Sequence, residues 1–364
     1  MTTREQEILD LITDNSLISQ IDIATKLDIT RSSVGVHISN LVKKGYIQGK
    51  GYILRDSPYI CVIGGANIDI QGFPENHLIQ HDSNPGKVEL SLGGVGRNIA
   101  ENLTKLKIDT NLITVLGDDL YADRIISHSK EIGLTIHDSM LLKEKNTSIY
   151  LSILDKNKDM NIAIASMDIF DFMDINFIKT KKNLISNSKL CIIDTNIPKE
   201  TIEFIVTNFT KTNFFLDTVS TTKAKKIKDL IGFFHTIKPN KLEAEILSGI
   251  KINSDSDLEK VGNYFIEQGV QEVFITLGKD GVFYKSKKSS GIINIPPVNV
   301  TNATGAGDAF LAGLAYAHFN SMTTKDSAVL GIGASIQALS HKDTINPNIS
   351  YNNIIKTIKE MKIC

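Results

Sequence analysis

The strongest constraint on the fold is a series of short apolar segments that each run into a Gly, Asp or Asn at or near the carboxyl end. Six of them are YICVIGG, NLITVLG, LCIIDTN, NFFLDTV, FHTIKPN and EVFITLG, beginning at residues 59, 111, 190, 213, 234 and 272. Most are separated by stretches with a helical pattern. Near-continuous apolar strands alternating with helices predict an α/β fold with a parallel sheet covered on both faces. Sites in such sheets form at the carboxyl ends of the strands, where these polar residues lie.

Composition limits the kind of protein this chain can be. It has 364 residues, of which 41% are hydrophobic and 22% charged, and its net charge is −1. This suits one large domain plus a small one, with no general attraction to nucleic acid or membrane. Cys61, Cys191 and Cys364 are far apart, which favours reduced thiols over disulfides or zinc. No apolar run approaches the roughly 18 residues of a membrane span, and MTTREQEILD is no signal peptide. We therefore expect a cytoplasmic protein.

Residues 1–57 are expected to form the small domain. A first helix is predicted around Ile8, a second from about Ser19 as N-cap, and a third capped by Thr30 and ended near Gly45. The residues expected to face inward are Ile8, Leu11, Ile12, Val34, Ile38, Leu41 and Val42. The segment YIQGKGYIL, residues 46–54, then alternates as a β-hairpin does. Three helices and a hairpin resemble a winged helix-turn-helix module.

The third helix would be the recognition helix of such a module. Between residues 30 and 44 it contains three cations and no acid, and recognition helices place cations on phosphates and their N-terminal side chains on base edges. The candidate DNA contacts are Arg31, Ser32, Ser33, His37, Lys43 and Lys44. A trihelical bundle used for dimerisation explains the same pattern, because residues 1–57 carry seven basic and seven acidic side chains.

The large domain, residues 58–364, follows the linker RDSP and contains the glycine-rich stretch NATGAGDAF, residues 302–310. Gly305, Ala306 and Gly307 lead into Asp308 and a helix expected to run to about Phe319. Free amides at the positive end of a helix bind anions, phosphate above all. The same position keeps a carboxylate ionised, as a general base must be. The alternative is that Asp308 only caps the helix.

Two further segments point to the same kind of chemistry. GGVGRN, residues 93–98, places Gly93 and Gly94 before a helix that would carry Asn98. It lacks the spacing of a dinucleotide fingerprint, and the chain has no P-loop motif. IKPNKLEAE, residues 237–245, supplies Asn240 and Glu243 with the spacing N-x-x-E.

Together these segments resemble the ribokinase-like (PfkB) family of sugar and nucleoside kinases over residues 58–364. The resemblance implies a three-layer sandwich with a mostly parallel central sheet and a small β-lid, whose strands lie near residues 70–92 and 144–165. It also implies phosphoryl transfer from ATP to a primary hydroxyl. Asp308 would take the hydroxyl proton, and the amides around Gly305, Ala306 and Gly307 would hold charge on the γ-phosphoryl oxygens.

The same resemblance implies ATP and Mg²⁺ as cofactors. The ion would be organised largely through water by Asn240 and Glu243, where it offsets the triphosphate charge. The residues implied along the ATP channel are Asn196, Asn240, Thr276, Gly278 and Gly281. Most family members carry Asp at position 302, where it helps to bind a monovalent cation. Because Asn302 offers an oxygen without charge, potassium dependence is expected to be weak.

On the acceptor side the chain resembles the pseudouridine kinases of this family. The resemblance rests on SNPGK, GGVGRN, NTS, KPNKLEAE and Asn302. Val95 replaces the usual Lys of the first signature and Arg97 precedes Asn98, so a contact expected for free ribose is missing. The implied substrate contacts are Asn67, Asp69, Gly93, Gly94 and Asn98 on the sugar, and Ser83, Asn84, Thr147 and Ser148 on the base. Pseudouridine has an N1–H where uridine has C–H, and a buried acceptor for that group would reject uridine.

Two other functions explain much of the same sequence. A kinase for another nucleoside or a ketose sugar would retain Asp69, Asn98 and Asp308 and differ in the lid. A transcription regulator that only senses its ligand would use the fold without needing Asp308. Members of the family often dimerise through the lid, so a homodimer is expected. The histidines are scattered without the spacing of a metal site, and we interpret them as structural or exposed.

Overall fold

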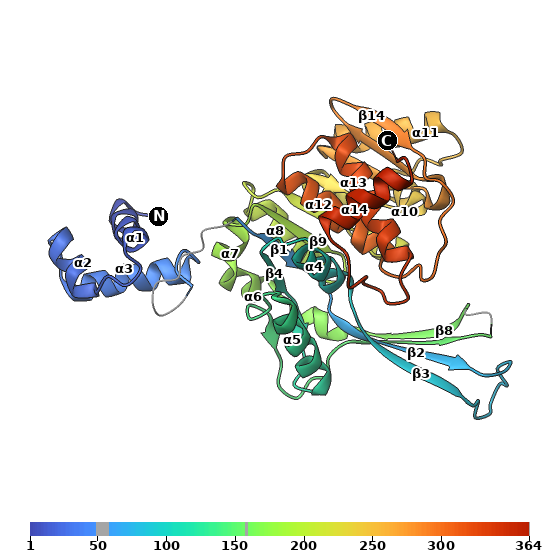
Figure 1. Cartoon of the computed structure of the whole chain (residues 1–364), viewed down its shortest axis with the longest axis horizontal. Helices are drawn as coiled ribbons and strands as arrows, with labels where there is room; N and C mark the ends of the chain where they lie inside the picture. The colour runs from blue at the N-terminus through green and yellow to red at the C-terminus, as the bar shows by residue number, and fades with distance from the viewer. Residues whose placement is uncertain (49–57, 157–158, 364) are drawn as a thin grey trace.

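The computed structural model describes residues 1–48, 58–156 and 159–363 (Figure 1). Its first three helices are α1 (Thr3–Asp14), α2 (Gln20–Leu27) and α3 (Arg31–Lys43). The side chains of Thr2, Ser19 and Thr30 cap them by accepting a hydrogen bond from a free amide of the first turn. The caps predicted at Ser19 and Thr30 are therefore confirmed.

The three helices surround a small core of their own. Asp28 adopts a left-handed conformation with φ of 51° in the short turn between α2 and α3, as in a helix-turn-helix. The buried residues of this core are Ile8, Ile12, Ile18, Ile23, Ala24, Val34, Ile38, Leu41 and Ile47. The prediction that Val42 faces inward is wrong: it is 45% exposed, since it lies about 100° around the helix from Leu41. The hairpin predicted over residues 46–54 falls mostly outside the described residues.

The large domain is built on a central sheet of eight strands in the order β14-β13-β12-β11-β10-β9-β1-β4. The first six strands in chain order pair in parallel, and β13 and β14 join one edge antiparallel. The strands are β1 (Ile60–Ile63), β4 (Thr110–Ile113), β9 (Leu190–Asp194), β10 (Phe214–Asp217), β11 (Thr236–Ile237), β12 (Glu272–Thr276), β13 (Val282–Ser286) and β14 (Ser290–Ile293). The apolar segments of the sequence thus form the mostly parallel sheet that they predict.

Helices cover both faces of this sheet, which makes the domain three-layered (Figure 1). Ile60 and Val62 of β1 pack with α4 (Val95–Lys105), α12 (Ala306–Phe319) and α13 (Thr324–Leu339), and α14 (Tyr351–Glu360) packs on α13. Cys61 and Ile63 face the opposite layer. That layer contains α6 (Ile175–Thr180), α7 (Lys182–Ser186), α8 (Lys199–Asn208), α9 (Thr221–Lys225), α10 (Lys241–Ser248), α11 (Asp255–Gln268) and the 3₁₀ segments η1 (Asp168–Phe172) and η2 (Lys228–Phe233). None of the helices in the described residues is long and apolar enough to cross a membrane.

A separate four-stranded sheet, which we call the lid, has the order β3-β2-β7-β8 and extends away from the central sheet (Figure 1). Its strands are β2 (Asn67–Pro74), β3 (Gly86–Gly93), β7 (Ile149–Leu154) and β8 (Met160–Ser166). Because side chains alternate along a strand, one lid face is aliphatic and the other polar. The inner part of the aliphatic face packs on α5 (Leu120–Ile132). Its outer part leaves Val88, Leu90, Ile162 and Ile164 exposed.

The far end of the lid contains two of the predicted base contacts. Asn67 pairs with Gly93 where β2 begins, and Pro74 pairs with Gly86 where it ends, so the hairpin is about 23 Å long at 3.3 Å per residue. Ser83 and Asn84 lie in the loop beyond that end. The side-chain amide of Asn84 is used within this loop, where it contacts the backbone of Ile79 at 2.7 and 3.0 Å. Within one chain, Ser83 and Asn84 are therefore separated by the length of the hairpin from Asn67 at the base of the lid, and their contact with the base stays a prediction.

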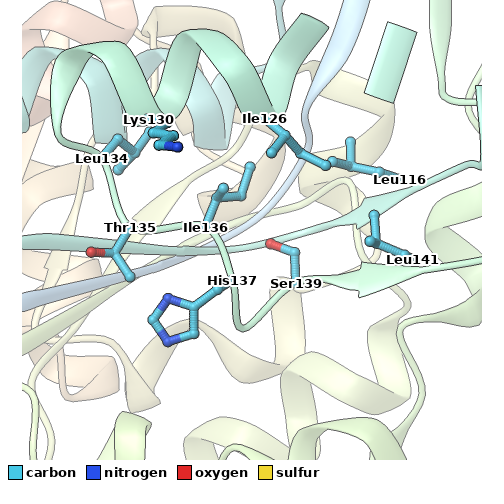
Figure 2. A pocket seen from close by; sticks show the side chains of 9 residues that line it. All are labelled: Leu116, Ile126, Lys130, Leu134, Thr135, Ile136, His137, Ser139 and Leu141. Atoms are coloured by element: carbon cyan, nitrogen blue, oxygen red, sulfur yellow. The ribbon is translucent and has the colours of Figure 1, made fainter. Parts of the chain in front are cut away.

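A shallow pocket of about 460 Å³ lies between α5 and the two short strands β5 (Val115–Leu116) and β6 (Met140–Leu141) (Figure 2). Leu116, Ile126, Leu134 and Leu141 supply much of its lining. The hydroxyl of Ser139, its most central polar group, already bonds to the backbone of residues 112 and 114. None of the predicted site residues lines this pocket, so the candidate site lies elsewhere.

Candidate active site

The turn before α12 places the backbone amides of a glycine-rich segment at the start of that helix. Gly305 is the N-cap of α12 and has φ of 81°, and a Cβ there would lie 2.3 Å from the carbonyl oxygen of Thr344. Only glycine fits a left-handed residue this close to another backbone segment. The amides of Gly305, Ala306 and Gly307 therefore lie at the positive end of a helix, where an anion is stabilised.

Asp308 lies in the first turn of α12, and its side chain is buried. It is not the cap of the helix, because Gly305 occupies that position and no side chain makes a capping bond there. Its Oδ2 instead accepts a hydrogen bond of 2.7 Å from Nδ2 of Asn98. Burial raises the pKa of Asp308 to about 7; the charge of Asp217 adds to this shift, and Lys238 and the Asn98 hydrogen bond oppose it. The expectation that the helix end keeps this carboxylate fully ionised is therefore wrong, because burial outweighs it. A pKa near neutrality suits a group that takes a proton at physiological pH.

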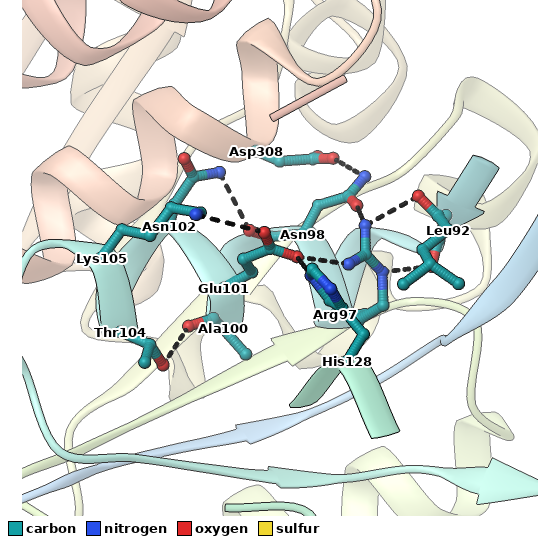
Figure 3. Close-up of polar contacts among 11 residues, drawn as sticks. Leu92, Arg97, Asn98, Ala100, Glu101, Asn102, Thr104, Lys105, His128 and Asp308 are labelled. Carbon is teal, nitrogen blue, oxygen red and sulfur yellow. Dashed lines mark hydrogen bonds and ion pairs between the residues drawn. The ribbon is translucent and has the colours of Figure 1, made fainter. Parts of the chain in front are cut away.

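Asn98 is held in one orientation by its neighbour Arg97 (Figure 3). Nη2 of Arg97 donates to Oδ1 of Asn98 at 2.5 Å and to the carbonyl of Leu92 at 2.7 Å, and Nη1 pairs with Glu101 at 2.5 Å. Since Oδ1 accepts from the guanidinium, Nδ2 is the atom left to donate to Asp308. Burial lowers the pKa of Arg97 and Glu101 opposes that shift. Arg97 acts on the site through Asn98, a role that the sequence pattern did not reveal.

Two carboxylates end neighbouring strands at the edge of the sheet that faces Asp308. Asp194 of β9 and Asp217 of β10 are partners in the strand register. Oδ2 of Asp194 accepts hydrogen bonds of 2.8 Å from the amides of Gly65 and Gly96. It thereby ties the loop after β1 to the start of α4. We missed Asp194 and Asp217 as site residues, although the preference of sites for the carboxyl ends of strands identified the correct edge.

Lys238 supplies the cation next to this carboxylate pair. Its Nζ lies 2.9 Å from Oδ2 of Asp217 and 3.3 Å from the carbonyl of Gly307. Burial lowers the pKa of Lys238, but Asp217 and Asp308 raise it more, so the net shift is upward and the ammonium stays charged. Lys238 directly follows β11, and the sequence pattern did not mark it as a site residue.

The predicted sugar-side residues meet where the lid joins the central sheet. Nδ2 of Asn67 donates to Oδ1 of Asp69 at 2.6 Å, and burial raises the pKa of Asp69. A Cβ on Gly93 would lie 2.3 Å from Oδ2 of Asp69, and one on Gly94, whose φ is 97°, would lie 2.4 Å from the carbonyl of Gly65. The two glycines therefore allow the turn to pass directly beside Asp69.

Of the two predicted base contacts on β7's side of the lid, the structure favours Ser148 over Thr147. The hydroxyl of Thr147 donates to Asp119 at 2.8 Å and accepts from the amide of Gly117 at 3.1 Å. These bonds hold the loop before α5, and the contact of Thr147 with the base stays a prediction. The hydroxyl of Ser148 is buried and has no hydrogen-bond partner among the described residues, and the same holds for Ser152, which we had not predicted. Buried polar groups without partners are rare and mark places where a ligand can bind.

An apolar cavity of about 390 Å³ opens beside the start of α12. Its lining includes Thr276, Gly278 and Gly281, which we predicted along the ATP channel, together with Ala306 and Gly307. Gly281 has φ of 101°, and a Cβ there would lie 2.0 Å from a carbonyl oxygen of β14. The cavity thus connects a wall of apolar side chains with the amides before Asp308, as a nucleotide site requires.

The other predicted ATP and magnesium residues lie outside the lining of that cavity. Asn196 follows β9, and its Oδ1 accepts a hydrogen bond from Lys223. Asn240 and Glu243 form a capping box at the start of α10: Oδ1 of Asn240 accepts from the amide of Glu243, and Oε2 of Glu243 accepts from the amide of Asn240, both at 2.9 Å. The hydroxyl of Thr218 also donates to Oε2 of Glu243 at 2.7 Å. The N-x-x-E spacing therefore has a structural use as well.

Both ends of the Asn302 amide are engaged by the backbone. Oδ1 accepts from the amide of Thr304 and Nδ2 donates to the carbonyl of Lys342, each at 2.9 Å. The side chain thus closes the loop before α12. An amide used in this way has no negative charge to offer a cation.

The predicted DNA contacts differ in how free their side chains are. Arg31, Ser32 and Lys43 are exposed on α3, whereas Ser33, His37 and Lys44 are half-buried. Nζ of Lys44 forms an ion pair of 2.5 Å with Glu5 of α1. The charge of Lys44 therefore stabilises the small domain, and the prediction that it contacts phosphate is not supported.

The environment of Asp308 makes a prediction about its titration. Replacing Asp217 with Asn removes a negative charge that raises the pKa of Asp308. It also removes the ion-pair partner of Lys238, whose positive charge then acts on Asp308 without opposition from Asp217. Both effects should lower the pKa of Asp308 below about 7. Lys238→Met should raise it above that value, because it removes the opposing cation. The measurement is the ¹³Cγ chemical shift of labelled aspartate, with Asp308→Asn to assign the signal. A native pKa near 3.8 would contradict this account of the site.

Comparison with known proteins identifies the families to which the two domains belong. Residues 57–350 match the family model for the pfkB family of carbohydrate kinases, and residues 1–48 match a winged helix-turn-helix DNA-binding family. YeiI, an uncharacterized sugar kinase of Escherichia coli (strain K12), is 34% identical over 98% of this chain and 99% of its own. Pseudouridine kinase of the same organism is 36% identical over 84% of this chain and 98% of its own.

A solved structure extends the comparison to three dimensions. A candidate sugar kinase from Clostridium perfringens is 41% identical and superimposes with a TM-score of 0.77 over 84% of this chain and 97% of its own. The shared part is the three-layer domain with its lid. The chain therefore belongs to the pfkB family of carbohydrate kinases, with a ribokinase-like α/β domain that follows an N-terminal winged helix-turn-helix domain.

Proposed function

We propose that this protein is an ATP-dependent kinase that phosphorylates the 5′-hydroxyl of pseudouridine. The observation that carries the proposal is the buried carboxylate of Asp308, which has a pKa of about 7 and lies next to the amides of Gly305, Ala306 and Gly307. A proton acceptor beside an anion site at a helix N-terminus is what phosphoryl transfer to an alcohol needs.

The proposed reaction is an in-line displacement. The substrate's 5′-oxygen forms a bond to the γ-phosphorus as the bond to the β,γ-bridging oxygen breaks, and Asp308 takes the hydroxyl proton. The amides before α12 hold the charge that builds on the transferred oxygens. Asn98 keeps the carboxylate aimed by donating to Oδ2, which leaves Oδ1 to receive the proton. The products are pseudouridine 5′-phosphate and ADP.

The residues present suit ATP and Mg²⁺. The apolar cavity beside Thr276, Gly278 and Gly281 would take the adenosine, with Asn196 further along the channel. Bound Mg²⁺ offsets the charge of the triphosphate. Oε2 of Glu243 already accepts two hydrogen bonds, which favours contact with the ion through water over direct coordination. Asn240 and Glu243 would therefore hold the ion through water.

Pseudouridine is the acceptor that the lid and the relatives favour. The relative named pseudouridine kinase matches at 36% identity, and Tyr150 and Ser152 of β7 pair with Asp69 and Gln71 of β2. By strand alternation, Ser148 and Ser152 point to the same lid face as Asp69. Their unpaired hydroxyls can accept the N1–H of pseudouridine, whereas uridine offers only C–H there. Leaving such an acceptor unpaired is costly, which gives selectivity.

We also propose that the small domain binds DNA. The match to a winged helix-turn-helix family and the exposed Arg31, Ser32 and Lys43 of α3 support this role. Ser33 and His37 lie on the same helix and would contact bases or phosphates from half-buried positions. The domain would then link nucleoside phosphorylation to transcription.

The aliphatic face of the lid supports a homodimer. Val88, Leu90, Ile162 and Ile164 are exposed together on one side of a sheet, and a monomer seldom leaves such a patch open to water. A second copy of the chain presents the same patch and would cover it symmetrically.

The acceptor prediction is tested by a panel of nucleosides and sugars scored by kcat/KM with ATP. Pseudouridine should be the best substrate and uridine a poor one. Replacing Ser148 or Ser152 with Ala should lower kcat/KM for pseudouridine by about 10- to 100-fold, the effect of one lost hydrogen bond to a buried partner. Ser166→Ala, at the exposed end of β8, is the control. Equal kcat/KM values for uridine, or a ketose as best substrate, would favour the alternative kinases.

The two activities should separate by mutation. Asp308→Asn should lower kcat by about two to four orders of magnitude and leave binding to the upstream DNA of its own operon unchanged. Arg31→Ala should weaken DNA binding and reduce its salt dependence without changing kcat. Lys26→Ala, an exposed cation on α2, is the control.

The outcomes of that experiment distinguish the alternatives. Full DNA binding without phosphorylation in the native protein would identify a ligand-sensing regulator. If the protein phosphorylates its substrate but shows no preference for the upstream DNA, the result would instead favour the alternative that the small domain is a helical bundle used for dimerisation. Fluorescence anisotropy at several salt concentrations and a coupled ADP assay are the measurements.

The dimer is tested by light scattering after size exclusion. The native protein should elute at twice the chain mass of 40.1 kDa, and Ile162→Asp with Ile164→Asp should reduce it to one chain, because charges on the aliphatic face cannot be buried unpaired. Lys87→Asp changes charge on the polar face of β3 and should leave the dimer intact. A native mass of one chain would exclude the dimer.

Potassium should have little effect on turnover. The Asn302 amide is occupied by the backbone of Thr304 and Lys342 and lacks the charge that a cation needs. Replacing a bulky organic cation with K⁺ in the kinase assay should therefore leave kcat nearly unchanged. A large increase in kcat with K⁺ would contradict this.

A further inference from the structure

A cluster of three metal-binding side chains lies at the amino edge of the central sheet, opposite the site around Asp308. His235 comes directly before β11, Glu272 begins β12, and His318 lies in the last turn of α12. One potential ligand atom of each lies within 4.8 Å of the other two, and all three residues are half-buried. The histidines that looked scattered in the sequence are thus brought together by the fold.

The two imidazoles are spaced as ligands of one ion would be. Their ring centres are 4.7 Å apart with an interplanar angle of 66°. Two imidazoles on one tetrahedral zinc ion, with Zn–N bonds near 2.0 Å, have ring centres about 5 Å apart. The pair therefore needs only small side-chain rotations to bind a common ion.

Each of the three side chains has one polar atom held by a neighbour. Nδ1 of His235 lies 2.8 Å from the hydroxyl of Thr236, Nε2 of His318 lies 3.2 Å from the amide of Asn213, and Oε1 of Glu272 accepts from Thr324 at 2.6 Å. Within the described part of the chain, no hydrogen bond engages Nε2 of His235, Nδ1 of His318 or Oε2 of Glu272. Metal ligands are oriented in this way, with one atom fixed by a neighbour and the other bound to the ion.

The charge at the cluster comes from the carboxylate of Glu272. It accepts a hydrogen bond from Thr324 and forms no ion pair among the described residues.

Ring packing alone does not account for this arrangement. His235 stacks on Phe215 with ring centres 5.8 Å apart and an interplanar angle of 9°, which explains its orientation but not the carboxylate of Glu272 beside it. We propose that His235, Glu272 and His318 form a binding site for a divalent transition metal of the zinc class, with water as the fourth ligand. The ion would join β11 and β12 to the last turn of α12. Asp308 lies ten residues earlier in that helix, about 15 Å away, so the role is structural.

The test uses the full chain without an affinity tag, stripped with a chelator and titrated with Co²⁺. About one ion should bind per chain and give the visible absorption of a low-coordinate nitrogen and oxygen site, and Zn²⁺ should displace it. His235→Gln, His318→Gln and Glu272→Gln should each weaken binding by at least tenfold. Thr324→Val should weaken it about 10- to 100-fold, because it removes the partner that orients Glu272.

His137→Gln is the matched control, because the side chain of His137 is 79% exposed and lies outside the cluster. It should bind Co²⁺ like the native protein. Absence of stoichiometric binding by the native chain, or full binding by the His235→Gln, His318→Gln double variant, would overturn the proposal. If a variant does not fold, X-ray absorption of the Zn²⁺-loaded native protein decides instead: two imidazoles per ion support the site, and none or one excludes it.

Discussion

The hydrogen bond from Asn98 to Asp308 is the interaction on which the candidate site depends. It joins two glycine-rich turns that are 210 residues apart in the chain, and it does so at the first turns of two helices that pack against each other. Without a donor, a carboxylate buried at that depth would be costly. With Asn98 held by Arg97 and Glu101, the carboxylate has one oxygen fixed and one free for chemistry.

The charge around that bond comes from the edge of a parallel sheet. Strands that run in the same direction place their last residues at one edge of the sheet. Asp194 of β9 and Asp217 of β10 therefore lie side by side, and Lys238 directly follows the neighbouring strand β11. These groups compete at Asp308: the carboxylates raise its pKa and the ammonium lowers it. The same helix that begins at the anion site ends beside His235 and Glu272 at the opposite edge of the sheet. The two edges are thus joined by one rigid element, α12.

Much of the fold follows from local patterns in the sequence. Apolar segments ending in polar residues predicted the parallel strands, and hydroxyl residues before apolar helices predicted the caps at Ser19 and Thr30. Such features are local, because they depend on residues within one turn or one strand. The error at Val42 has the same origin. The buried face of α3 was assigned from hydrophobicity alone, and it therefore included Val42, which lies next to that face and is exposed.

The candidate site was predictable only where a short motif carries it. Asp308, Asn98 and the glycines of both turns were found because their spacing is itself the signal. Ser83, Asn84 and Thr147 were assigned to the base from a resemblance between short motifs. Such a resemblance does not show that Ser83 and Asn84 lie beyond a long hairpin or that Thr147 bonds to Asp119. Ser152 was missed because no neighbouring residue in the sequence indicates that its hydroxyl is buried without a hydrogen-bond partner. Asp217 was missed because no neighbouring residue indicates that its charge lies near Asp308.

The sequence by itself therefore determined the element types, the sheet that they build and the two glycine-rich motifs that carry Asn98 and Asp308. Only the tertiary structure decided which other side chains surround Asp308 and what charge they carry there. The physical reason is that propensity and capping act over a few residues, whereas burial, register and the pKa of a carboxylate depend on groups brought together from anywhere in the chain.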